Sequence, residues 1–174
     1  MVLEKDLTLV FPMETKFDVM EIDGIKQKIE RRQGLVVPSI RRAGGLAVLW
    51  RKSLQVDIMS YSSGHIDAIV SEEQGMKKWR FTGFYGHLET SKRGESWTML
   101  EDLSRWSNLW VCMGDFNEIM HAKEKVGGGI RPEGQMRCFI EIINRCRLRD
   151  MRYVGSNYTS SENLKIPLWL HFKP

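Results

Sequence analysis

The hydrophobic periodicity of the chain changes near residue 88, and this change constrains the fold more than any other feature. Before it, apolar and polar residues tend to alternate, most clearly in the segment 77–86 (KKWRFTGFYG). After it, apolar residues return every three or four positions, as in the segment 91–106 (SKRGESWTMLEDLSRW). Alternation is typical of strands and the longer spacing is typical of amphipathic helices. Strands and helices mixed in this way predict an α/β (α+β) layered domain.

Several elements are expected before residue 88. The segment Met1–Pro12 is expected to contain one strand, and Phe17–Glu30 has apolar residues at helical spacing, with Gly34 expected to stop that helix. Four strands then follow in quick succession, joined by short turns, which predicts an antiparallel meander. These four strands are expected at 46–50, 54–62, 65–73 and 77–86.

The second half of the chain predicts two helices around one strand. In the first helix, 91–106, Trp97 and Leu100 belong to one apolar stripe, and Ser96 or Ser91 is expected to cap its start. The strand is expected at 108–113, and a glycine-rich loop at 121–135. The second helix, 134–146, has the cleanest amphipathic pattern in the chain, whereas little pattern is visible from Leu148 onward.

Composition excludes few classes of function. The chain has 174 residues, 42% hydrophobic and 28% charged, which is typical of one globular domain. Its net charge of +4 permits a polyanionic partner without requiring one. The three cysteines and four histidines have no metal-ligand or redox spacing, and no leader or membrane span is visible. We therefore expect a monomer in the nucleus or cytoplasm, not a secreted protein.

The segment 112–120 (CMGDFNEIM) ends an apolar run with two acids and an amide within four positions. Side chains alternate along a strand, so Asp115 and Asn117 are expected on one face. A carboxylate beside an amide can orient a water, or hold a cation while the amide donates to a phosphate oxygen. Asp and Asn are also ordinary turn residues, and residue types alone favour the turn. Glu118 is expected to be a surface neighbour.

Two other expected strand ends carry polar side chains. Glu14 follows the first apolar run, and Tyr85 and His87 lie at the end of the fourth strand of the meander. A lone Glu is usually solvated, and a Tyr at a strand end is more often half-buried packing than chemistry. If the strands are neighbours, however, Glu14, Tyr85 and Asp115 would converge at one edge, where sites in sheet proteins commonly lie.

The motifs METK, GGLAVLWR, TGFYGHLETSKRGESW, GDFNEI, EKVGGG and QMRCFIEIINRC together carry a resemblance. They resemble the endonuclease domain of plant LINE-type (non-long-terminal-repeat) retrotransposons, which is similar to the endonuclease/exonuclease/phosphatase superfamily. The similarity runs from about Met13 to about Thr159. The pairing of TGFYGH with GDFNEI at this spacing carries the resemblance, because either motif alone is weak.

The resemblance implies a fold, a metal and a set of site residues. The fold would be a four-layer αββα sandwich, and the activity would be Mg²⁺-dependent (or Mn²⁺-dependent) hydrolysis of phosphodiester bonds in DNA, with RNA as a second possible partner. Glu14 would be the metal ligand, and Tyr85 would contact the scissile phosphate. Asp115 would orient or activate the attacking water, and Asn117 would steady the phosphate in the transition state. Such a set suits a reaction that needs a metal, an aligned water and oriented donors.

The chain also departs from the family pattern at both ends. No Trp-Asn pair precedes Glu14, and the sequence departs after Thr159, where His171 follows Leu170 instead of an Asp. We therefore expect residues 1–160 to form a partial domain of this type, and 161–174 to form a divergent tail. Because members of a catalytic unit act together, missing members would impair the hydrolysis.

Two alternatives remain open from the sequence. In the first, the chain is a non-catalytic retrotransposon remnant that at most binds nucleic acid weakly through Lys and Arg. A steep salt dependence of DNA binding without cleavage would select this alternative. The other alternative keeps the superfamily but changes the substrate to a phosphorylated small molecule or lipid. The motif GFYGHLETSKRGESW and the mildly basic charge favour nucleic acid over that substrate.

Overall fold

The computed structural model describes residues 8–13, 33–38, 45–72, 78–105, 109–124, 129–150 and 168–172, the last segment by its backbone alone. The chain divides into two compact units, Met1–Gly83 and Phe84–Pro174. Strand β6 (Lys78–Tyr85) runs across the boundary between the units. The helix expected at 17–30 lies outside the described residues. No helix in the described part of the chain is long and apolar enough to cross a membrane.

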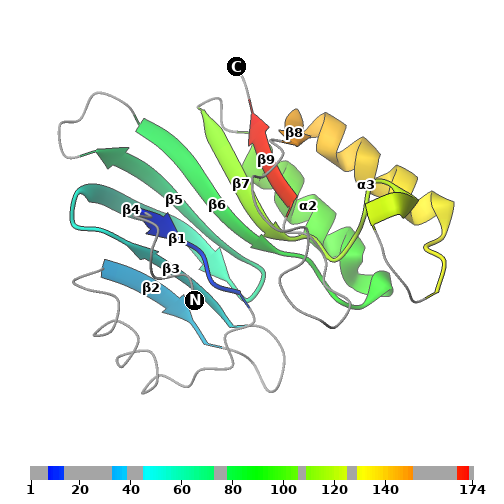
Figure 1. The fold of residues 1–174 in the computed structure, drawn as a ribbon, viewed down its shortest axis with the longest axis horizontal. Coiled ribbons are helices and arrows are strands. Elements are labelled where there is room, and N and C mark those ends of the chain that lie inside the picture. Colours follow the sequence, from blue (N-terminus) through cyan, green and yellow to red (C-terminus); the bar gives the residue numbers. More distant parts are fainter. Residues whose placement is uncertain are drawn as a thin grey trace. The chain divides into compact units, whose positions relative to one another are not determined.

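The described part of the first unit consists of strands (Figure 1). One sheet has the order β1-β3-β2, with β1 (Leu9–Val10) and β2 (Gln33–Val37) both antiparallel to β3 (Leu46–Trp50). The long hairpin of β4 (Leu54–Ser62) and β5 (His65–Glu72) begins a six-stranded sheet. The order of this sheet is β4-β5-β6-β7-β9-β8, with β7 at Trp110–Asp115, β8 at Leu148–Asp150 and β9 at Leu168–Phe172.

Two expectations for this unit are wrong. The segment Leu46–Trp50 is a strand, but it belongs to the three-stranded sheet and not to a four-strand meander. Gly34 does not stop a helix, because it lies inside β2 opposite Leu49. A Cβ at Gly34 would stand only 2.8 Å from the carbonyl oxygen of Val48, so glycine permits the close pairing of these two strands.

The expected alternation along β6 is confirmed. On one face, the Phe81 ring packs edge-on against Phe11, with ring centroids 5.9 Å apart. On the other face, Arg80 and Thr82 both bond the buried carboxylate of Asp67, with Arg80 Nε and Thr82 Oγ1 lying 2.8 and 2.6 Å from Oδ1. The buried charge of Asp67 is thus paired and hydrogen-bonded, and such pairing offsets the cost of removing a charge from water.

In the described part of the second unit, the two α-helices lie beside each other and pack on strands (Figure 1). Helix α2 is Arg93–Ser104 and helix α3 is Glu133–Arg145, and both expected helices are confirmed. Strand β7 is Trp110–Asp115. The buried core shared by these elements is apolar and is formed by Phe84, Trp97, Leu100, Leu103, Trp110, Cys112, Phe116, Phe139, Ile142, Ile143, Cys146 and Leu148.

The start of α2 differs from the expectation. Among the described residues, Lys92 occupies the N-cap position, and no side chain caps the helix with a hydrogen bond. Ser91 lies instead in the short 3-10 helix Thr90–Lys92. Ser96 is buried, and its Oγ accepts a hydrogen bond of 2.9 Å from the backbone N–H of His87. The hydroxyl therefore holds the preceding loop and does not cap the helix.

The chain after α3 contains more structure than its sequence pattern indicates. Strand β8 (Leu148–Asp150) pairs with β9 (Leu168–Phe172), which in turn pairs antiparallel with β7. In this register His171 lies opposite Val111 of β7 and Arg149 of β8. The described elements form two sheets and two α-helices, so the α+β class that the sequence predicts is confirmed.

A buried histidine links the two strands of the long hairpin. Both ring nitrogens of His65 form hydrogen bonds with serines of β4. Nε2 lies 2.9 Å from Ser60 Oγ, and Nδ1 lies 2.8 Å from Ser62 Oγ. Burial lowers the pKa of His65 below 6.5, while nearby Asp67 acts to raise it and Arg80 acts to lower it further. The native hairpin therefore favours the neutral ring.

We predict that this histidine makes stability depend on pH. Because the folded pKa is below the unfolded value of 6.5, the unfolded state binds more protons once the pH falls under that value. The contribution of His65 to the free energy of unfolding should be present above pH 6.5 and lost as the pH falls towards the folded pKa. Urea unfolding at several pH values should therefore give a steeper acid loss for the natural chain than for His65→Asn. Parallel profiles would contradict this assignment.

Candidate functional site

The ends of β6 and β7 are joined by two backbone-directed hydrogen bonds. The backbone N–H of Gly86, just after β6, donates to the carbonyl oxygen of Asp115 at 2.8 Å. In return, Asn117 Nδ2 donates to the carbonyl oxygen of Gly86 at 2.7 Å. We call residues 85–87 and 115–118, held together in this way, the strand-end corner. The corner lies within the second unit.

Two glycines allow the backbones to approach this closely. Gly114 has φ +151°, and a Cβ there would overlap the carbonyl oxygen of Phe84. A Cβ at Gly86 would overlap the carbonyl of Phe116. Any larger residue at either position would push the two strand ends apart, so both glycines are required by geometry.

Asn117 fixes the turn that follows β7. Its backbone has φ 56°, a left-handed conformation that Asn tolerates better than most residues. Its N–H donates to Asp115 Oδ1 at 2.7 Å, which closes a local turn through the side chain. Asn117 has no exposed surface. The turn interpretation and the site interpretation of GDFN are therefore compatible, because the turn is what presents Asp115.

The structure brings three of the four predicted site residues together. Tyr85 ends β6 and is buried, with 8% of its surface exposed. Asp115 ends β7 and is half-buried, so part of its surface reaches solvent. Asn117 lies two residues further and bonds both segments. The fourth predicted residue, Glu14, lies outside the described residues.

Aromatic rings of the hydrophobic core pack against the corner. The Phe116 ring, in the middle of GDFN, stacks on Phe84 with centroids 4.9 Å apart. The Phe116 ring centroid also lies 5.5 Å from that of Phe139 of α3, and Phe139 stacks on Trp97 of α2 with centroids 5.0 Å apart. The turn carrying Asp115 is thus anchored in the hydrophobic core, which gives it a fixed position.

Glu118 is not the surface residue that the sequence predicts. It is buried, and its side chain is only 1% exposed. Glu118 Oε2 lies 2.5 Å from Arg93 Nη1, and Oε1 accepts from the N–H of Ile119 at 3.1 Å. Arg131 Nε lies 2.9 Å from Oε1, as an ion pair without hydrogen-bond geometry. One buried acid therefore faces two arginines.

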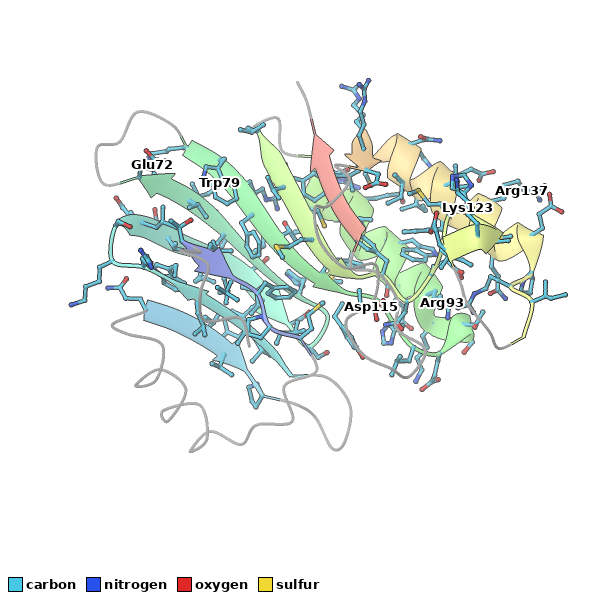
Figure 2. All side chains as sticks on the ribbon, viewed as in Figure 1. Glu72, Trp79, Arg93, Asp115, Lys123 and Arg137 are labelled. Carbon is cyan, nitrogen blue, oxygen red and sulfur yellow. The ribbon has the colours of Figure 1, made fainter. Side chains whose placement is uncertain are left out.

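Arg93, which the sequence analysis did not single out, is the centre of this cluster. Its Nε and Nη2 donate to the carbonyl oxygens of His87 and Leu88, each at 3.3 Å, and its Nη1 also donates to Gln135 Oε1 at 3.4 Å. Burial lowers the pKa of Arg93, while the carboxylates of Glu118 and Asp115 oppose that shift. Figure 2 shows Arg93 at the start of α2 and Asp115 at the end of β7.

The sequence held one signal for Arg93. The residue lies four positions before Trp97 and seven before Leu100, so it continues the apolar stripe of α2. A charge at a position of the buried face needs a buried partner. Nothing local identifies that partner as Glu118, which is 25 residues away in the sequence.

His87 stands at the rim of the corner. Its side chain is 45% exposed, and Nε2 lies 3.7 Å from Glu95 Oε2. Its backbone is held more firmly than its ring, because the N–H bonds Ser96 and the carbonyl accepts from Arg93. The histidine is thus placed beside the corner by backbone contacts.

A metal fits this arrangement only in part. Within the described ranges, no three His, Cys, Asp or Glu side chains gather closely enough to hold a metal ion. Asp115 is the carboxylate at the surface of the corner, and its Oδ1 already accepts from Asn117. Within the part of the chain that the structure describes, the residues of the corner do not by themselves form a metal site.

Comparison with solved structures identifies the fold. A 3′ phosphatase from Neisseria, NExo, bound to a product DNA hairpin, matches with a TM-score of 0.63 and 13% identity over 97% of this chain and 77% of that chain. An endonuclease/exonuclease/phosphatase family protein from Bacteroides thetaiotaomicron matches with a TM-score of 0.61 and 11% identity over 95% and 67%. The chain has the endonuclease/exonuclease/phosphatase fold.

A third structure with the endonuclease/exonuclease/phosphatase fold comes from a mobile element. It is the endonuclease domain of TRAS1, a telomere-specific non-LTR retrotransposon, with a TM-score of 0.59 and 7% identity over 88% of this chain and 78% of that chain. No protein-family model matches the sequence, and no curated protein sequence matches it. The likeness is thus one of fold at low sequence identity.

We predict that Gly114→Ala destabilises the corner strongly. Alanine would have to adopt φ +151° and would place its Cβ against the carbonyl oxygen of Phe84. The cost should exceed about 2 kcal/mol of unfolding free energy, measured by urea unfolding. Gly134→Ala in α3 is the matched control, because a Cβ there has no neighbour within 4 Å. That control should leave stability unchanged or raise it by up to about 1 kcal/mol. Equal effects of the two changes would refute the close approach.

Proposed function

We propose that this chain hydrolyses phosphodiester bonds in nucleic acid, with DNA as its substrate and the strand-end corner as its catalytic site. The observation that carries the proposal is the double hydrogen bond between Gly86 and the GDFN turn. This bond holds the chain position of Tyr85 next to that of Asp115. The two polar side chains therefore end neighbouring strands at one place.

In this proposal Asp115 orients and deprotonates the attacking water. Its carboxylate is half-buried, and one oxygen is held by the N–H of Asn117. A carboxylate with a fixed direction is suited to general-base catalysis, because the lone pair must point at the proton that it removes. Tyr85 would donate through its hydroxyl to the scissile phosphate. Asn117 would hold the turn in place and would thereby steady the phosphate indirectly.

The proposal assigns Mg²⁺ or Mn²⁺ binding to Glu14, as the resemblance of METK to the family motif implies. When bound, such an ion would offset the negative charge that develops on the phosphate. The residues of the corner would then position the water and the phosphate oxygens. Removal of the ion by a chelator should abolish hydrolysis.

Support for nucleic acid as the substrate comes from the fold and from the sequence. The TRAS1 structure is an endonuclease domain, and the NExo structure holds a product DNA hairpin. The motifs around Tyr85 and Asp115 resemble the endonuclease of plant non-LTR retrotransposons. The net charge of +4 agrees with a polyanionic substrate.

We predict that Asp115→Asn removes most of the activity. The amide keeps the shape of the carboxylate but cannot take a proton from water. The rate of nicking of a supercoiled plasmid, measured with Mg²⁺ and repeated with Mn²⁺, should fall on the order of 100-fold or more. Asp57→Asn is the matched control, because Asp57 is an exposed carboxylate on β4.

Three outcomes decide the proposal. Nicking that stops on chelation and on Asp115→Asn, but not on Asp57→Asn, supports it. Nicking that persists in Asp115→Asn shows a contaminating nuclease or another site, and contradicts it. Salt-sensitive DNA binding without any nicking contradicts it and selects the non-catalytic remnant.

A further inference from the structure

We infer that Arg93 is a positioning residue, which sets the geometry of the strand-end corner by tying its two loops to each other through Glu118. The inference deepens the proposed function and rests on it for the catalytic consequence. The coupling of the two loops through Arg93 can be measured without any activity.

Arg93 contacts both loops, and its Nη1 also donates to Gln135 of α3 at 3.4 Å. Towards the loop after β6, Nε and Nη2 donate to the carbonyl oxygens of His87 and Leu88. Towards the loop after β7, Nη1 donates to Glu118 at 2.5 Å. A guanidinium can do this because its donors project from a rigid plane in several directions. A lysine keeps the charge but lacks the planar fork.

Glu118 transmits the contact to the rest of the corner. It follows Asn117 directly, and its own carboxylate also accepts from the N–H of Ile119. The bonds of Arg93 and the bonds of Asn117 therefore act on the same turn, from two sides. Asn117 joins the turn to Gly86, and Arg93 joins Glu118 to residues 87 and 88.

The burial of the Arg93–Glu118 pair favours a role in geometry over a role in stability. The side chains of Arg93 and Glu118 are only 7% and 1% exposed. A buried ion pair is a poor source of stability compared with an apolar pair of the same size. A buried ion pair instead adds geometric specificity, because its charge-assisted hydrogen bonds form only when the two side chains are correctly placed. Glu118 belongs to the corner, and Arg93 bonds both Glu118 and the carbonyl oxygen of His87, so this directional pair acts on both segments of the corner.

The first arm of the test measures amide hydrogen exchange by NMR in Arg93→Lys. The reporter amides are those of Gly86, His87 and Asn117, which bond Asp115, Ser96 and Asp115 respectively. We expect protection of these three amides to fall at least about ten-fold, with the β4–β5 ladder unchanged. Unchanged protection at the three amides, or a uniform loss across the chain, would overturn the inference.

Two further variants serve as a control and as a replacement for Arg93→Lys. Arg80→Lys is the matched control, because Arg80 is equally buried but bonds Asp67 in the first unit. It should leave the three reporter amides protected. If Arg93→Lys does not fold, Glu118→Gln takes its place, because the amide keeps the size and one acceptor oxygen. Selective loss at the reporters in that variant supports the inference, and its absence contradicts it.

The second arm measures nicking kinetics in the same variants. We expect kcat to fall on the order of 100-fold in Arg93→Lys with KM unchanged, because misplacing a catalytic group by about 1 Å has an effect of that size. An unchanged kcat despite lost protection would overturn the positioning role. A natural chain without nicking would refute the proposed function alone, since the exchange arm still decides whether Arg93 couples the loops.

Discussion

The close approach of the backbones at the ends of β6 and β7 is the constraint on which the rest of the site depends. Gly114 meets Phe84, and Gly86 meets Phe116, with no room for a Cβ at either glycine. At this separation Gly86 can exchange hydrogen bonds with the turn after β7. The rings of Phe84 and Phe116 stack as a consequence, which fastens the turn to the core of the second unit.

Much of the fold and part of the site could be predicted from the sequence. Local alternation predicts the strand that ends in Tyr85, and an apolar run predicts the strand that precedes Asp115. The fold class follows from the mixture of strand and helix periodicities. The ion pair of Arg93 and Glu118 could not be predicted, because it joins residues 25 positions apart. The prediction that Gly34 ends a helix is wrong for a similar reason, because its strand is defined by pairing with β3 and not by its own residues.

The endonuclease/exonuclease/phosphatase fold and the strand-end corner support the same proposal from different directions. The fold is shared with a retrotransposon endonuclease and with a 3′ phosphatase at no more than 13% identity, so it fixes architecture and not substrate. The corner is a property of this chain's own residues. It holds an acid with one oxygen fixed, beside the end of a strand that carries a tyrosine. The proposed hydrolysis depends on that acid.

The most direct test of the account is a measurement of scalar couplings across hydrogen bonds by NMR on the isotope-labelled chain. We predict one coupling between the Gly86 amide nitrogen and the Asp115 carbonyl carbon, and a second between Asn117 Nδ2 and the Gly86 carbonyl carbon. Observation of both would establish that the two strand ends form one locked corner. If both couplings are absent and the Gly86 amide exchanges as fast as an unprotected one, the corner does not exist in solution and cannot be the catalytic site.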